Sequence, residues 1–92
     1  MSDIHIERPH NLPIDELRQR LDKLAAELGQ KFGIVSSWSG DICHLKGSTV
    51  KNGELKIGDS GVSIDITLGM MGKIFKKPIE DGILARIDDV LS

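Results

Sequence analysis

From Ile34 to Leu68 the chain alternates between apolar and polar residues, and glycines interrupt this alternation at short intervals. A period of two is typical of β-strands that have one covered face and one solvent-exposed face. The pattern predicts four strands in an antiparallel meander, joined by short turns at 40–41, 51–53 and 58–61. The Asn52-Gly53 pair is the strongest of these hairpin signals, because both residues tolerate a positive φ angle.

An amphipathic helix is predicted before this segment, over residues 13–32. Its apolar residues recur every three or four positions and so share one face: Ile14, Leu17, Leu21, Leu24, Leu28 and Phe32. Pro13 suits the first helical position, and Gly33 suits the residue just past the helix end. The leucines could also form the seam of a coiled coil, but this seam spans only about two to three heptads, which favours packing on the sheet.

A second helix is predicted near the end of the sequence, with one apolar side formed by Ile79, Ile83, Ile87 and either Val90 or Leu91. Two arrangements of the preceding segment are open. Pro78 could lie in the first turn of this helix, with residues 74–77 forming a separate short turn, or it could kink a longer helix. Gly82, inside the helix, is expected to cost up to about 1 kcal/mol relative to alanine.

A short strand is predicted around Ile4 and Ile6, which alternate with polar residues and are followed by Pro9. The resulting element order is β-α-β-β-β-β-α. We therefore predict an α+β two-layer sandwich, in which an antiparallel sheet of about five strands carries two helices on one face. This order is similar to a reduced helix-grip arrangement. The length of 92 residues predicts a single domain, 1–92, with one core.

The composition argues against several classes of protein. A formal net charge of −2 and only three aromatic side chains, with no tyrosine, are atypical of nucleic-acid-binding proteins. The single cysteine cannot form an internal disulfide. No apolar run approaches the roughly 20 residues of a transmembrane segment, and residues 1–10 do not resemble a secretory signal. A cytoplasmic location is therefore expected.

The chain offers four soft metal ligands, His5, His10, Cys43 and His44. They lack the close pairs of a zinc site, and Cys43 and His44 would point to opposite faces of a strand. We expect no metal site, an inert Cys43 in the core, and histidines on the surface. His44 could not activate Cys43 as a nucleophile from the opposite face, so no catalytic residue and no cofactor are predicted.

Two further groups of residues have structural interpretations. Adjacent carboxylates are expected on the solvated sides of the helices, at Asp15-Glu16, Glu80-Asp81 and Asp88-Asp89. The spacing of the late glycines fits no phosphate-binding loop, so we interpret them as turn residues: Gly58, Gly61, Gly69 and Gly72. We therefore predict that the protein is not an enzyme.

One segment has the composition of a contact surface. Apolar and basic residues lie side by side in it: Met70, Met71, Lys73, Ile74, Phe75, Lys76 and Lys77. Methionines suit adaptable contacts, and lysines attract anionic surfaces. We predict a binding patch formed by these seven residues. The alternative is that Ile74 and Phe75 close one end of the core while the lysines stay solvated.

The whole chain also resembles a known family, the polyhydroxyalkanoic acid system proteins, also called polyhydroxyalkanoate granule-region proteins. The opening matches the pattern I-H-I-x-R-x-H-x-L of that family with Ile4, His5, Ile6, Arg8, His10 and Leu12. The middle matches with Lys31-Phe32-Gly33, Trp38 and Gly40. The final third matches with Leu68-Gly69, Phe75-Lys76, Ile79-Glu80 and Ile83. Residues 70–73 and Gly82 depart from the pattern.

The resemblance implies an accessory protein of polyhydroxyalkanoate storage and carries no catalytic residue over to this chain. It suggests contact with the granule surface or with granule proteins, and hence a granule-associated location in the cytoplasm. The alternative function is a small module that binds an acyl chain or lipid in a cavity between the sheet and the helices. A homodimer through a sheet edge or a helix is also open.

Overall fold

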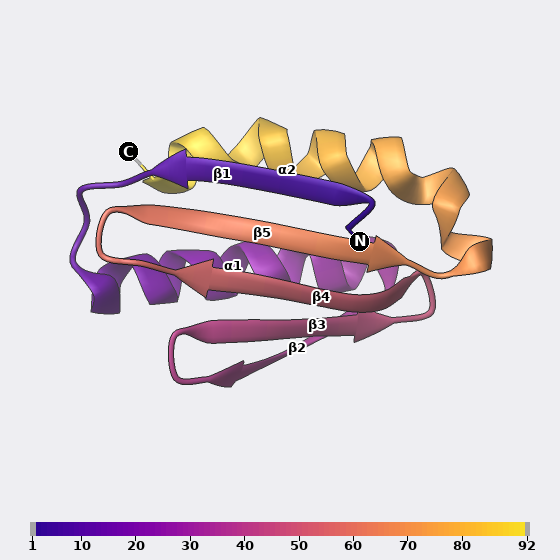
Figure 1. The fold of residues 1–92 in the computed structure, drawn as a ribbon, viewed down its shortest axis with the longest axis horizontal. Helices are drawn as coiled ribbons and strands as arrows, with labels where there is room; N and C mark the ends of the chain where they lie inside the picture. Colours follow the sequence, from indigo (N-terminus) through magenta and orange to yellow (C-terminus); the bar gives the residue numbers. More distant parts are fainter. Residues whose placement is uncertain (1, 92) are drawn as a thin grey trace.

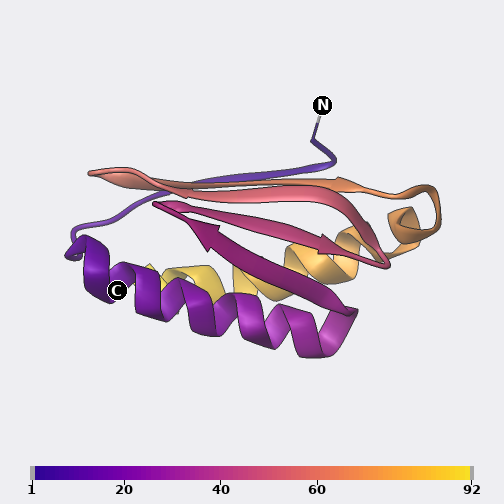
Figure 2. The same cartoon turned by 90° about the horizontal axis from the view of Figure 1, so that it is seen from below.

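The computed structural model describes residues 2–91 and contains one sheet with two helices on one of its faces (Figures 1 and 2). The elements are β1 (Ile4–Pro9), α1 (Ile14–Phe32), β2 (Ile34–Ser39), β3 (Ile42–Gly47), β4 (Val50–Ile57), β5 (Gly61–Leu68), a 3₁₀ helix η1 (Met70–Phe75) and α2 (Lys76–Leu91). This confirms the predicted α+β fold class, the five antiparallel strands and the element order.

The strands lie in the order β1-β5-β4-β3-β2, so β1 and β2 form the two edges of the sheet. The chain reaches this order because β2 to β5 form a meander and β1 returns to pair with β5, for example Ile4 opposite Ile66. In Figure 1, β1 lies between β5 and α2, whereas β2 borders the sheet on the other side.

The core lies between the sheet and the helices, and aliphatic side chains fill it. Among the described residues, twenty apolar side chains are at most 7% exposed. From α1 they include the four leucines of the predicted apolar face, and from α2 they include Ile79, Ile83 and Ile87. On β5 the buried and the partly exposed residues alternate, as the sequence predicts. The leucines therefore pack within the domain rather than in a coiled-coil seam.

The start of α1 differs by one residue from the prediction, and its end agrees with it. Pro13 precedes the first helical residue, and its carbonyl oxygen accepts a hydrogen bond from the backbone nitrogen of Leu17 at 2.9 Å. Gly33 follows the last helical residue with φ 68°, in the left-handed region that glycine adopts at low cost. Asp15 and Glu16 lie in the first turn, where the helix dipole favours negative charge.

The predicted turn at 51–53 is wrong. Asn52 and Gly53 lie inside β4, and the connection from β3 is instead made by Ser48 and Thr49. Gly53 is buried between Leu45 and Ile66, and a Cβ atom added there would lie 3.1 Å from the Leu45 Cβ. The pairing of β4 with β5 shifts register between Val50 and Asn52. Gly53 thus allows close strand packing rather than a positive φ angle.

The segment after β5 agrees with the first of the two arrangements considered above in the place of Pro78, but the separate turn covers residues 70–75 rather than 74–77. Residues 70–75 form η1, and Pro78 lies in the first turn of α2, where its missing N–H costs no helical hydrogen bond. The helix is therefore not kinked from within by this proline. η1 lies at one end of the molecule, beyond the C-terminal end of β5 (Figure 1).

Candidate functional site

The residues of the predicted binding patch are exposed at the surface, on and just after η1. Three apolar side chains are almost fully exposed: Met70 at 91%, Met71 at 82% and Ile74 at 79%. Phe75 is 37% exposed. The alternative that Ile74 closes the end of the core is wrong. We call Met70, Met71, Lys73, Ile74, Phe75, Lys76 and Lys77 the η1 patch.

The backbone of η1 is held against the turn between β3 and β4. The backbone nitrogen of Gly69 donates a hydrogen bond to the carbonyl oxygen of Thr49 at 3.2 Å. Gly72 is buried, and a Cβ atom added to it would lie only 1.9 Å from that same oxygen. The turn interpretation of Gly72 was therefore incomplete, because its missing side chain allows η1 to approach Thr49. This close contact places the neighbouring methionines and Ile74 on the outside.

The lysines give the η1 patch a positive charge. Residues 70–77 contain three lysines and no acidic residue, and all three lysines are exposed. Lys73 has one acidic neighbour, with 3.9 Å between its Nζ and Asp3 Oδ1. The other carboxylate oxygen of Asp3 accepts a hydrogen bond from the backbone nitrogen of Leu68 at 2.8 Å. The η1 patch therefore combines exposed apolar groups with cations on a short, anchored segment.

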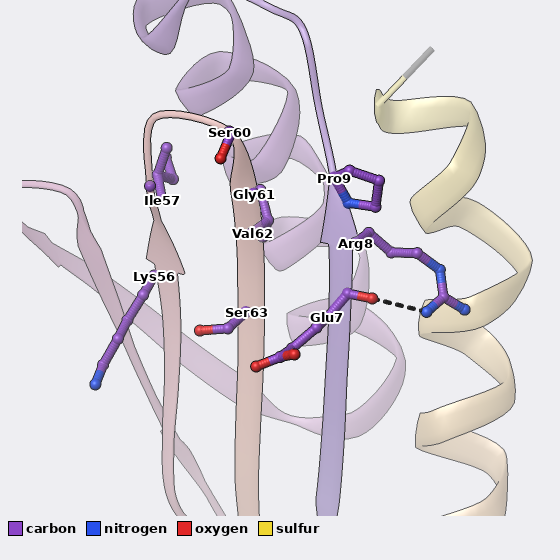
Figure 3. Close-up of a pocket in the computed structure, with 10 residues that line it drawn as sticks. Glu7, Arg8, Pro9, Lys56, Ile57, Ser60, Gly61, Val62 and Ser63 are labelled. Carbon is purple, nitrogen blue, oxygen red and sulfur yellow. Dashed lines mark hydrogen bonds between the residues drawn. The ribbon is translucent and has the colours of Figure 1, made fainter.

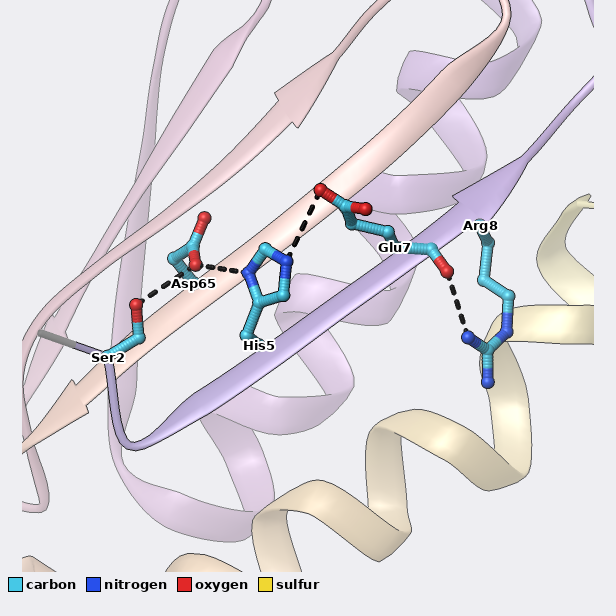
Figure 4. Close-up of polar contacts among 5 residues, drawn as sticks. All are labelled: Ser2, His5, Glu7, Arg8 and Asp65. Atoms are coloured by element: carbon cyan, nitrogen blue, oxygen red, sulfur yellow. Dashed lines mark hydrogen bonds and ion pairs between the residues drawn. The ribbon is translucent and has the colours of Figure 1, made fainter.

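A second cluster lies on the solvent-exposed face of the sheet, where β1 pairs with β5 (Figure 4). The ring of His5 lies between two carboxylates: its Nδ1 is hydrogen-bonded to Asp65 Oδ1, and its Nε2 lies 3.3 Å from Glu7 Oε1. Ser2 Oγ also donates to Asp65 Oδ1, at 3.0 Å. The hydrogen bond and the charge of Asp65 raise the pKa of His5 above its ordinary value, and the hydrogen bond from His5 lowers the pKa of Asp65. The sequence did not reveal this pair, because 60 positions separate its members.

The His5 cluster predicts a pH dependence of stability. Because folding raises the pKa of His5, its contribution is fully present below the pKa of the unfolded chain and is lost as the pH rises through the folded pKa. The lowered pKa of Asp65 gives a contribution that is lost as the pH falls through that pKa. We expect Asp65→Asn to lower the pKa of His5, measured by following its ring protons by NMR. Asp41→Asn, in the turn between β2 and β3, is the control; a shift as large with this control would contradict the assignment.

The other soft ligands lie apart from this cluster. Cys43 is fully buried, burial raises the pKa of its thiol, and His44 is exposed on the opposite face, as predicted. The prediction of a surface position is wrong for His10, which is 5% exposed. The chain between β1 and α1 folds against the turn between β4 and β5, where His10 Nε2 is hydrogen-bonded to the Gly58 carbonyl oxygen at 2.7 Å. Within residues 2–91, no group of three or more histidine, cysteine or acidic residues could hold a metal ion.

A shallow, open hollow of about 600 Å³ lies over the ends of β1, β4 and β5 (Figure 3). Glu7, Lys56 and Ser63 line it together with the backbone of the turn between β4 and β5. The Arg8 side chain, also at its rim, turns toward α2 (Figure 3) and lies 3.5 Å from Asp88 through its Nε. Because it is open at the surface and lies over the ends of the strands, this hollow is not a cavity enclosed between the sheet and the helices.

A comparison with protein-family models decides the relationship of the chain to known proteins. The model of the family described as "putative polyhydroxyalkanoic acid system protein", the granule-region family, matches residues 4–91. The chain belongs to this family. No match was found to a curated protein or to a solved structure.

In this member of the granule-region family, many residues that carry the family resemblance serve the fold. Ile4, Ile6, Ile79 and Ile83 are core side chains, and Gly33 ends α1. His5 is a different case, because it lies on the exposed face in the cluster with Asp65. None of the helices in the described part of the chain is both long and apolar enough to span a membrane.

Proposed function

We propose that this protein is a non-enzymatic accessory protein of polyhydroxyalkanoate storage, and that it acts in the cytoplasm by binding the granule surface through the η1 patch. Membership of the granule-region family supports the setting. The main support for binding through the η1 patch is the exposure of Met70, Met71 and Ile74 next to three lysines. Flexible apolar side chains adapt to an irregular apolar surface, and lysines add attraction to anionic groups there.

The rigidity of the attachment supports the same proposal. η1 is fixed to the body by the contacts of Gly69 and Gly72 with Thr49, so the apolar side chains are held in the exposed position before binding. A pre-organised segment loses less conformational entropy on binding than a flexible one. In contrast, the hollow over β1, β4 and β5 is open at the surface rather than enclosed between the sheet and the helices, so it does not support the alternative of an acyl chain held in an internal cavity.

Granule binding is expected to fail when acidic residues replace the apolar ones. In co-sedimentation with isolated granules, Met71→Asp combined with Ile74→Asp should bind at least about 100-fold more weakly than the wild type, because burying each apolar side chain is worth roughly 1.5–3 kcal/mol. Both side chains are exposed, so the fold should persist, as circular dichroism would verify.

Lys56→Glu is the matched control for charge. It changes the net charge by the same two units, and Lys56 is exposed near the end of β4 that leads to β5, at the opposite end of the strand from the Ser48-Thr49 turn that holds η1. Its recovery with granules should equal that of the wild type. Equal recovery of the double variant and the wild type would show that the η1 patch does not bind granules.

The same assay distinguishes a granule surface from granule proteins as the partner. Binding to polyester particles stripped of protein would identify the surface itself, whereas binding only to native granules would identify a protein on them. The dependence of binding on salt concentration would measure how much Lys73, Lys76 and Lys77 contribute to the binding free energy, since salt screens exposed charges. Substituting these three lysines with glutamine should remove that dependence.

A further inference from the structure

The two edges of the sheet are protected to very different degrees. Edge strands expose unpaired backbone groups and can pair with other chains, and soluble proteins usually block them with charges, prolines, bulges or covering segments. β1 carries Glu7 and Arg8 and ends at Pro9. α2 also lies beside it, and Arg8 Nε is 3.5 Å from Asp88 Oδ1 (Figure 1). The β1 edge is therefore blocked.

The β2 edge has none of these devices. Its sequence, IVSSWS, contains no charged residue and no proline, and its pairing with β3 is regular over all six residues. Val35 is 72% exposed on it. Among residues 2–91, none offers a backbone hydrogen bond to the outer side of β2. Figure 2, which views the molecule toward this edge, shows β2 in front of the rest of the sheet.

We propose that β2 is a dimerisation edge, at which two copies of this chain pair antiparallel and join their sheets into one. The absence of charge is the argument for a second copy, because a two-fold axis brings the same short segment of both chains together, and a charge near the axis would lie close to its own copy and be repelled by it. Three serines and two aliphatic residues in β2 meet no such repulsion. The interface is self-complementary in this sense.

The alternation of side chains limits the position of the two-fold axis. Residues directly opposite each other in an antiparallel pair point to the same face. In β2, Ile34 is buried on the helix side, and Val35 and Ser37 are exposed on the other. If the two sheets join with all their helices on one side, the two-fold axis must therefore pass through Ser36 or through Ser37. An axis between Ser36 and Ser37 would pair residues that point to different faces of the sheet.

Trp38 lies beside this edge on the helix side and is already held in place there. Its Nε1 donates a hydrogen bond to Asp22 Oδ1 at 3.1 Å, and the Arg18 guanidinium carbon lies 5.0 Å from the ring centroid. With the axis through Ser36, Trp38 lies opposite Ile34 of the second copy; with the axis through Ser37, it lies opposite Ser36 of that copy. In either register a half-buried aromatic ring gains a neighbour.

Sedimentation of the full chain tests the proposal. The wild type should sediment with twice the mass of one chain at high concentration. Val35→Lys combined with Ser37→Lys places four ammonium groups on one face around the axis and should weaken the dimer at least about tenfold. The matched control, Val35→Thr combined with Ser37→Thr, should stay dimeric. A wild type that is monomeric at every concentration, or a dimer that the lysines leave unchanged, would overturn the proposal.

Cross-linking gives a second test that does not depend on a repulsive variant. Opposed Cα atoms in an antiparallel pair lie about 4.5–5.5 Å apart, within the range that a disulfide can bridge. Oxidation should therefore link Ser36→Cys or Ser37→Cys into a covalent dimer, whichever lies on the axis. Ser63→Cys on the inner strand β5 is the control, and native Cys43 is fully buried. If neither edge variant links faster than Ser63→Cys, β2 is not the interface.

Discussion

Replacing Ile83 with alanine is expected to lower the free energy of unfolding by about 2–5 kcal/mol. Ile83 is 0% exposed at the middle of the apolar face of α2, between Ile79 and Ile87. The loss has two parts: the transfer energy of the removed methyl and methylene groups, and the cavity left in an interior that packs closely. For a domain of this size, whose total stability is roughly 5–14 kcal/mol, this is a large fraction.

Leu84→Ala is the matched control, because Leu84 is the next residue on the same helix and is 37% exposed. It removes as many carbon atoms, but the lost contacts are partly with solvent, and we expect a change smaller than about 1 kcal/mol. Chemical denaturation of both variants measures the difference. A loss for Leu84→Ala that equals the loss for Ile83→Ala would contradict the assignment of the buried face of α2.

The sequence was sufficient for the fold wherever a local period determines which side chains are buried. The spacing of the leucines in α1 and of the isoleucines in α2 predicts both helices, and the alternation in β5 predicts its buried face. These signals are local, because a helix or strand repeats its orientation over a few residues. The order of the strands could not be read in this way, since it depends on β1 returning to β5.

The Asn52-Gly53 pair shows where a strong local signal fails. Asparagine followed by glycine favours a hairpin turn because of backbone freedom, but β4 needs a residue without a side chain opposite Leu45. Packing between neighbouring strands prevails over the local preference of two residues. Glycine has both uses, and the sequence alone does not separate them.

The candidate site was predictable in its composition but not in its geometry. The mixture of methionines and lysines indicated a contact surface, yet the exposure of Ile74 follows from how Gly69 and Gly72 pack on Thr49. These contacts join residues 20 and 23 positions apart in the chain. The pairing of His5 with Asp65 likewise follows from the register of β1 on β5.

Replacing Gly72 with alanine should therefore destabilise the protein as well as displace the η1 patch. The new Cβ would lie 1.9 Å from the Thr49 carbonyl oxygen and 2.7 Å from its carbonyl carbon, both backbone atoms. Thr49 itself is held, since its Oγ1 donates a hydrogen bond to the Phe32 carbonyl oxygen at 3.3 Å. Overpacking of this kind costs about 1–3 kcal/mol, occasionally more. A thermal melt should show Tm lower by roughly 4–20 °C.

Gly82→Ala is the control that separates this contact from a general effect of replacing glycine. Gly82 lies in α2, where a Cβ atom would meet only Phe32 Cε2, at an ordinary contact distance of 3.8 Å. Alanine is preferred to glycine in a helix interior by about 1 kcal/mol, so this variant should raise Tm by a few degrees. Replacing glycine with alanine is thus expected to change Tm in opposite directions at two positions ten residues apart. If Gly72→Ala melts at or above the wild-type temperature, η1 is not anchored on Thr49, and the exposed position of Met71 and Ile74 loses its structural cause.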